Sequence, residues 1–323
     1  MSNLIKVGVL RGGAPDEYDV SLKTGSQVLK HLPENKYHPF DMLIDREGIW
    51  YLSGFPITLD TLRYKIDVVF NALHGYYGED GKVQQFLENL HIPYTGSGPL
   101  ASALAMNKKL AKNKFNELGI KTPLVYIISE GLNYNQIAND IFNKISPPWI
   151  IKPISGGSSI GIRIVKTISD LILILKEIDN DKHNFIVEQF IQGREATCGV
   201  IQDFRGDNLY SLLPVQILRP KNNFFSTEMK YNKKTKEICL GNFSREENQK
   251  LQDLAKKIHN GFNLKHYSRS DFIITNSGQI YALEVNSLPG FTEDSLFPLA
   301  LDSIGCLKST FLDHIVTLAL NKK

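Results

Sequence analysis

Hydrophobic residues in the first hundred positions form short runs separated by stretches with helical spacing. Residues 7–10 and 67–71 are two such runs and predict buried strands. A helix is expected to begin near residues 19–21, and residues 83–89 also have helical spacing. Because strands alternate with helices here, the pattern predicts a parallel α/β sheet for residues up to about 100.

The chain beyond residue 100 mixes strand and helix patterns without regular alternation. Residues 104–118 predict one amphipathic helix. Strands are predicted at residues 149–153, 162–165 and 185–188. Residues 271–274 and 279–285 are typical of a hairpin. This part of the chain is therefore expected to be α+β.

Composition narrows the class of protein. The chain has 323 residues, enough for two or three domains, and its 42% hydrophobic and 22% charged content is ordinary for a soluble globular protein. The net charge of +3 gives no reason to expect nucleic acid or a membrane surface as a partner. The apolar run at 7–10 is too short for a signal-peptide core. The three cysteines are far apart and are expected to be free thiols, so we expect a cytoplasmic protein.

The predicted hairpin places several polar residues on one face. If its loop is residues 277–278, Asp271 pairs with Glu284 and Arg269 pairs with Asn286. Side chains alternate with period two, so all four share a face. Two carboxylates and an amide suit Mg²⁺. A solvent-exposed face of mixed charge is the alternative.

A glycine- and serine-rich loop follows the strand at 149–153. Its small residues, at positions 155–161, let backbone N–H groups approach phosphate oxygens. Lys152 lies inside the apolar strand and needs an anionic partner if it is buried. A phosphate would serve. The alternative is a plain glycine-rich hairpin whose lysine reaches solvent.

Two motifs suggest other classes of protein. Residues 157–161 match G-x-S-x-G, the nucleophile turn of many hydrolases, but that motif needs a following helix and a strand is predicted here. Residues 96–101 match G-x-G-x-x-A outside the first strand–helix turn. Both are disfavoured. The basic segment 229–234 is either a solvated loop or a flap that closes over phosphates.

Together these segments resemble the D-alanine–D-alanine ligases of the ATP-grasp superfamily. The likeness covers nearly the whole chain, in order and spacing. It is carried by residues 12–22, 72–81, 93–98, 106–108, Lys152, 157–161, Glu188, Glu195, 230–231, 269–271 and 284–296. The resemblance implies an N-terminal α/β substrate-binding domain at 1–105. A two-lobed ATP-grasp domain follows, with a central lobe at 106–187 and a C-terminal lobe, carrying metal site and flap, at 188–323.

The resemblance also implies how ATP is held. Lys108 and Lys152 would bind phosphates, Glu188 the adenine, Glu195 the ribose and Lys230 the terminal phosphate, with Ser159 beside them. Two Mg²⁺ ions, with Mn²⁺ as an alternative, would be bound by Asp271, Glu284 and Asn286.

The remaining implied roles concern the amino acids. Glu17 would bind the ammonium of the first D-alanine, linked to Ser158 and Tyr231, with His74 nearby. Arg269 and the N–H of Gly290 would form an oxyanion hole, and Ser295 would hold the second D-alanine. The implied reaction joins two D-alanines through an acyl phosphate, for peptidoglycan precursors, in a homodimer.

Some positions depart from the family pattern, and alternatives stay open. Tyr18 replaces the usual arginine, Asp19 the usual glutamate, and residues 154–156 and 239–241 also differ. One alternative is a related ligase with another acceptor, such as D-lactate, D-serine or a different amino acid. Others are a serine hydrolase at Ser158 and a nucleotide-binding regulator without activity.

Overall fold

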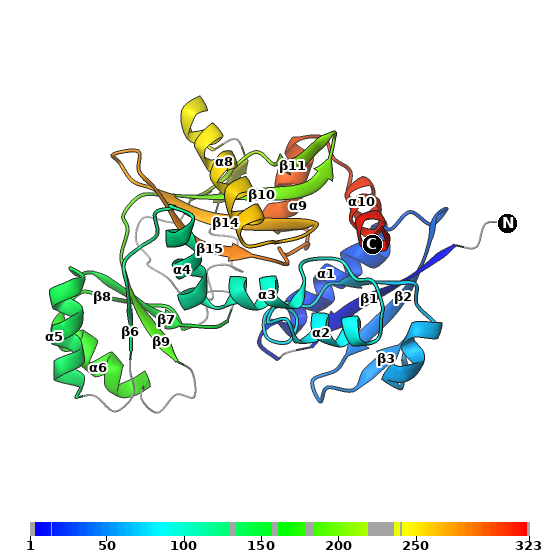
Figure 1. The fold of residues 1–323 in the computed structure, drawn as a ribbon, viewed down its shortest axis with the longest axis horizontal. Helices are drawn as coiled ribbons and strands as arrows, with labels where there is room; N and C mark the ends of the chain where they lie inside the picture. Colours follow the sequence, from blue (N-terminus) through cyan, green and yellow to red (C-terminus); the bar gives the residue numbers. More distant parts are fainter. Residues whose placement is uncertain are drawn as a thin grey trace.

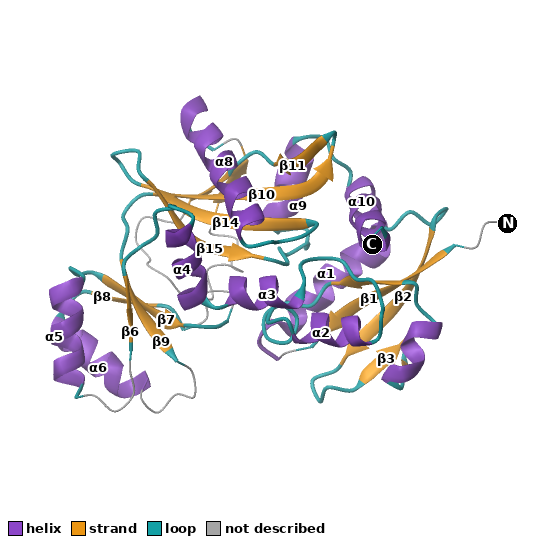
Figure 2. Cartoon of the chain, viewed as in Figure 1, coloured by secondary structure: helices purple, strands orange, loops and turns teal. Residues whose placement is uncertain are grey.

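Three sheets organise the chain in the computed structural model (Figures 1 and 2). The structure describes residues 4–13, 15–128, 133–156, 161–178, 184–218, 236–239 and 241–321. Among these, no helix is long and apolar enough to cross a membrane. The predicted domain division at residues 105 and 187 stays a prediction.

The N-terminal sheet has the order β4-β3-β2-β1-β5. Its strands are β1 (Ile5–Gly12), β2 (Tyr37–Ile44), β3 (Trp50–Leu52), β4 (Phe55–Pro56) and β5 (Val68–Asn71). Its helical elements are η1 (Pro15–Glu17), α1 (Tyr18–His31), η2 (Leu59–Tyr64) and α2 (Lys82–Asn89). Strand β1 pairs in parallel with β2 and β5, which confirms the predicted α/β arrangement at the centre. The antiparallel edge of β3 and β4 was not predicted.

Two helices replace the single helix predicted at 104–118, which was wrong. Helix α3 (Pro99–Met106) and helix α4 (Lys108–Glu117) are separated by a single residue, Asn107. The Asn107 side chain accepts a hydrogen bond from the Leu110 N–H. A short amide side chain caps a helix better than it continues one. Lys108 therefore becomes the first residue of a helix.

The central sheet is antiparallel, with the order β6-β9-β7-β8. Its strands are β6 (Val125–Ile127), β7 (Trp149–Pro153), β8 (Arg163–Val165) and β9 (Phe185–Gln189). Helices α5 (Tyr134–Lys144) and α6 (Ile168–Ile178) cover one face, on the left of Figure 1. Trp149, Ile151 and Val187 pack against these helices in a core of their own.

The C-terminal sheet has the order β13-β12-β10-β14-β15, and β11 pairs with β10. Its strands are β10 (Arg194–Phe204), β11 (Asp207–Ser211), β12 (Val215–Leu218), β13 (Lys236–Cys239), β14 (Tyr267–Ile274) and β15 (Ile280–Asn286). Its helices are α8 (Arg245–Gly261), α9 (Leu296–Ser303) and α10 (Lys308–Leu320). The mixture of antiparallel sheets and helices confirms the α+β prediction.

The β14–β15 hairpin reaches the predicted pairing by a different route. Thr275 and Gln279 close a three-residue loop, 2.9 Å apart between the Thr275 nitrogen and the Gln279 oxygen, so the predicted two-residue loop was wrong. One extra residue on β15, Leu283, then forms a bulge opposite the step from Asp271 to Phe272. The bulge shifts the register back by one.

The restored register confirms the predicted partners. Asp271 lies opposite Glu284, and Arg269 lies opposite Asn286. Val285 is buried, whereas the bulged Leu283 is only half-buried.

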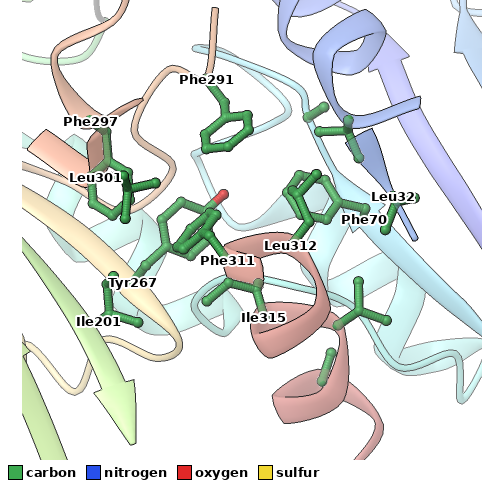
Figure 3. Packing of buried hydrophobic residues seen from close by; sticks show 14 of the residues in the cluster. Leu32, Phe70, Ile201, Tyr267, Phe291, Phe297, Leu301, Phe311, Leu312 and Ile315 are labelled. Carbon is green, nitrogen blue, oxygen red and sulfur yellow. The ribbon is translucent and has the colours of Figure 1, made fainter. Parts of the chain in front are cut away.

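One hydrophobic core joins the two ends of the chain (Figure 3). Leu32 and Phe70 of the N-terminal sheet layer meet Phe311 and Ile315 of α10, and the same core continues to Tyr267 on β14. The N-terminal part and the C-terminal lobe thus share their interior, whereas the central lobe keeps a separate one.

Candidate active site

A cleft of about 410 Å³ lies where the N-terminal loop 74–81, helices α3 and α4, the loop after β7, and β15 come together. This volume includes space that is open to solvent. The lining residues are Gly75, Glu79, Ala105, Met106, Lys108, Gly156, Glu284, Val285, Asn286 and Ser287. Three predicted site residues, Lys108, Glu284 and Asn286, are thereby brought to one place.

The C-terminal wall of the cleft carries a bidentate ion pair. The Arg269 Nε and Nη2 donate to the two Asp271 oxygens at 3.0 and 2.9 Å. Thr197 Oγ1 also donates to Asp271, at 2.5 Å, and Asn286 Nδ2 approaches it at 3.4 Å. Burial lowers the pKa of Arg269, but Asp271 and Glu284 outweigh burial, so the net shift is upward. The guanidinium stays charged.

The chemistry of this wall fits magnesium. Among the described residues, no group of three or more histidines, cysteines or acidic residues is arranged to hold a metal ion. The register instead groups two carboxylates, Asp271 and Glu284, with the amide of Asn286. Three hard oxygen donors are too few to enclose an ion but suit Mg²⁺, which shares its ligands with phosphates and water.

Behind the residues that line the cleft, α4, β7 and β9 carry a buried cluster of two lysines and one glutamate, which we call the central wall. Lys152 Nζ lies 2.9 Å from Glu188 Oε2, and Lys112 Nζ lies 3.0 Å from Glu188 Oε1. Burial lowers the pKa of Lys112 to about 8, although Glu188 acts against this. Burial raises the pKa of Glu188, but the two lysines outweigh it and the net shift is downward. The carboxylate is therefore ionised between two cations.

Lys112 was missed by the sequence analysis. It is fully buried, although a lysine in an amphipathic helix is usually assigned to the solvent face. Lys108, Lys112 and Phe115 are spaced by four and three residues, so they share one helical face. The buried Phe115 marks that face as inward. This spacing was the available signal.

Other predicted ATP-site residues are placed only in part. Lys108 Nζ donates to the Gly156 carbonyl at 2.7 Å, which ties α4 to the loop after β7. Glu195 lies on β10 opposite Ile273. Ser158, Ser159, Lys230 and Tyr231 lie outside the described residues.

On the N-terminal side of the cleft, Gly75 packs against the carboxylate of Glu17, which is predicted to bind the substrate. Glu17 is buried at the start of α1. A Cβ added to Gly75 would lie 1.9 Å from Glu17 Oε2, and the φ of Gly75 is +66°. Only glycine fits this close approach. Glu79, also missed by the sequence analysis, accepts from the Gly75 N–H at 2.9 Å and lines the cleft.

A chain of contacts links the N-terminal side of the cleft to the loop after β15. His74 Nε2 lies 2.9 Å from Thr24 Oγ1, which also accepts from the Phe291 N–H at 3.4 Å. Phe291 follows Gly290, where an added Cβ would lie 3.0 Å from Ser295 Oγ. The residues predicted for the two amino acids are therefore neighbours.

Comparison with known proteins identifies the class. Residues 53–97 match the family model "D-ala D-ala ligase N-terminus", and residues 115–317 match "D-ala D-ala ligase C-terminus". The chain belongs to the D-alanine–D-alanine ligase family, an ATP-dependent ligase family with the ATP-grasp fold. The predicted resemblance is confirmed.

Particular relatives are similar along the full length. A D-alanine–D-alanine ligase from Aquifex aeolicus is 37% identical over 97% of this chain and 100% of its own. The Bacillus anthracis D-alanine–D-alanine ligase in complex with ATP has a TM-score of 0.80 at 30% identity, covering 99% of this chain and 98% of that one. VanG, a D-Ala:D-Ser ligase from Enterococcus faecalis, has a TM-score of 0.82 at 28% identity, covering 98% and 100%.

Proposed function

We propose that this protein joins two D-alanine molecules into D-alanyl-D-alanine, with ATP converted to ADP and phosphate. The supporting observation is a cleft flanked by two clusters, the central wall and the C-terminal wall, that carry surplus charge of opposite sign, in a chain of this family. The central wall has two lysines for one glutamate. The C-terminal wall has two carboxylates for one arginine. A nucleotide triphosphate with Mg²⁺ matches both walls.

In this proposal the first step activates a D-alanine carboxylate. Its attack on the terminal phosphate brings anions together, so cations must offset the repulsion. Lys108 and Lys152 bind phosphates, with Ser159 and Lys230 beside them, Glu188 and Glu195 contact the adenine and ribose, and the step gives an acyl phosphate and ADP. Asp271, Glu284 and Asn286 hold Mg²⁺, which neutralises phosphate charge when bound.

In the second step the other D-alanine, with its amine deprotonated, attacks the acyl carbon, so the peptide C–N bond forms, the C–O bond to phosphate breaks and inorganic phosphate leaves. Glu17, linked to Ser158 and Tyr231, holds the ammonium of the first D-alanine beside His74. Arg269 and the Gly290 N–H stabilise the developing oxyanion, and Ser295 binds the second carboxylate. No covalent enzyme nucleophile is needed. We place the protein in the cytoplasm as a homodimer that supplies peptidoglycan precursors.

A ligase with another acceptor is the second candidate. VanG supports it, because that D-Ala:D-Ser ligase and the ATP-bound D-alanine ligase have nearly the same structural similarity to this chain. Tyr231 favours D-alanine over D-lactate, since a neutral phenol gives no advantage to an acceptor that arrives as a net anion. The preference should grow from about pH 6 to 9, as more amine is deprotonated. Competition between D-alanine, D-serine and D-lactate, read by product mass, tests this.

Release of ADP with and without D-alanine is the decisive experiment. Release that depends on D-alanine, with one dipeptide formed per ADP, is expected. Ester cleavage without ATP, abolished by Ser158→Ala, would instead identify a serine hydrolase. ATP binding without turnover under any acceptor would identify a regulator.

A further inference from the structure

Lys112 connects three parts of the molecule from inside helix α4. Its Nζ lies 3.0 Å from Glu188 Oε1 on β9 and 3.0 Å from Thr122 Oγ1. Thr122 in turn donates to the Ala282 carbonyl on β15 at 2.9 Å. Lys112 therefore links β9, which carries Glu188, with the β14–β15 hairpin, which carries the C-terminal wall.

The charges around Lys112 come from three strands. Glu188 on β9 attracts it, Lys152 on β7 repels it, and Glu284 on β15 attracts it more weakly. Glu188 and Lys152 alone would make a neutral buried pair, and Lys152 would then offer little net attraction to another anion. Lys112 adds a second cation to the same carboxylate. Among Lys112, Lys152 and Glu188, one positive charge is left over, which favours an anion nearby.

We propose that Lys112 is a positioning residue for ATP. Lys112 neutralises the charge of Glu188, so that the positive charge of Lys152 remains available to attract a phosphate. The inference rests on the proposed function, because that function supplies the anion. Lys112 does not touch the nucleotide in this arrangement. It acts through Glu188 and through the Thr122 contact, which keeps β9 against β15. Its loss should therefore weaken binding of the phosphates more than binding of the nucleoside.

Lys112→Met tests this, because methionine keeps the bulk of the stem and removes the charge. Calorimetry should show a dissociation constant for ATP raised on the order of tenfold or more, and a dissociation constant for adenosine raised by a clearly smaller factor. The KM for D-alanine should stay near the wild-type value. Lys114→Met is the matched control, because Lys114 is on the same helix, is partly exposed and pairs with Glu117. It should bind ATP as the wild type does.

Two further variants keep the test decisive if Lys112→Met does not fold. Lys112→Arg retains the charge and should retain most of the ATP affinity. Thr122→Val removes the hydroxyl beside Lys112 and should raise the ATP dissociation constant several-fold. A folded Lys112→Met with wild-type ATP affinity would overturn the proposal. So would an unfolded Lys112→Met together with unchanged affinity in Thr122→Val.

Failure of the proposed function gives a different result. A wild-type protein that binds ATP but forms no dipeptide would refute the D-alanine reaction. The ATP and adenosine affinities of the Lys112 variants would still decide the role of Lys112.

Discussion

The two charged walls of the cleft differ in exposure as well as in sign. Side chains of the central cluster, Lys112, Lys152 and Glu188, are between 1% and 7% exposed. In the C-terminal wall, Arg269 and Asp271 are 15% and 16% exposed. A buried charge is fixed by the fold, whereas a partly open one can exchange its partners with solvent ions. Under the proposed function, the central wall would be a permanent anion-binding site, and the C-terminal wall would take up its cation reversibly.

The largest effect on turnover should come from a change in the C-terminal wall. Glu284→Gln removes one negative charge but keeps the shape, so the cation should bind more weakly. Loss of a metal ligand costs several kcal/mol of transition-state stabilisation, and we expect ADP formation to slow about a hundredfold or more. The measurement is the rate of ADP formation against Mg²⁺ concentration. Near-normal turnover at low Mg²⁺ would contradict the metal assignment, and Glu246→Gln, on an exposed side chain, is the control.

A smaller effect is expected from the central wall. Lys152→Ala leaves Glu188 paired with Lys112 and removes the surplus positive charge. The KM for ATP should rise about ten- to hundredfold, because a charge-assisted contact to phosphate is lost. Steady-state kinetics on ATP measures this, with the exposed Lys176→Ala as control. Ser158→Ala should affect D-alanine more than ATP, and an equal effect on both would weaken the comparison.

The residues of the C-terminal wall were easier to predict from the sequence than those of the central wall. Counting outward from a turn placed Asp271 opposite Glu284, but only because the longer loop and the Leu283 bulge offset each other. Neither feature follows from alternation, since a bulge depends on packing against neighbouring strands. The fold class was predictable from hydrophobic periodicity. The helix break at Asn107 was not, because capping depends on where the helix must end.

The central wall was predictable only in part. Lys152 was identified because a lysine inside an apolar strand needs an explanation. Its partner in the structure is Glu188, for which the resemblance implies a place at the adenine, and no pattern in the sequence points to Lys112 as a second partner. Pairing across β7, β9 and α4 is a tertiary contact, which the spacing along one segment does not reveal.

A third prediction tests the central wall alone, through the pH dependence of ATP binding. The pKa of Lys112 is lowered by burial to about 8, so its ammonium is charged below that pH and neutral above it. ATP should therefore bind more weakly at pH 9 than at pH 7, by roughly three- to tenfold. Lys112→Arg stays charged over this range and should lose the slope. Calorimetry at both pH values is the measurement, and parallel slopes in the two proteins would assign the titration elsewhere.

The smallest effect is expected from the thiols. Burial raises the pKa of Cys198 to about 12 and also raises that of Cys306, so both are poor nucleophiles. The side chain of Cys239 lies outside the described residues. Replacing all three with alanine should leave turnover per folded molecule within about twofold of the wild type, since packing changes affect mainly stability. Rapid inactivation by a thiol reagent that ATP prevents would show that a cysteine lies in the cleft.

The core shared by the two ends of the chain has a consequence for biosynthesis. Phe70 and Leu32 belong to segments that leave the ribosome first, whereas Phe311 and Ile315 belong to α10, which leaves among the last residues (Figure 3). Domains usually fold in order as they are made, but one apolar face of this N-terminal sheet is covered by α1 alone until α10 arrives. We expect nascent chains that stop before residue 308 to bind chaperones, and the central lobe, with its own core, to fold without waiting.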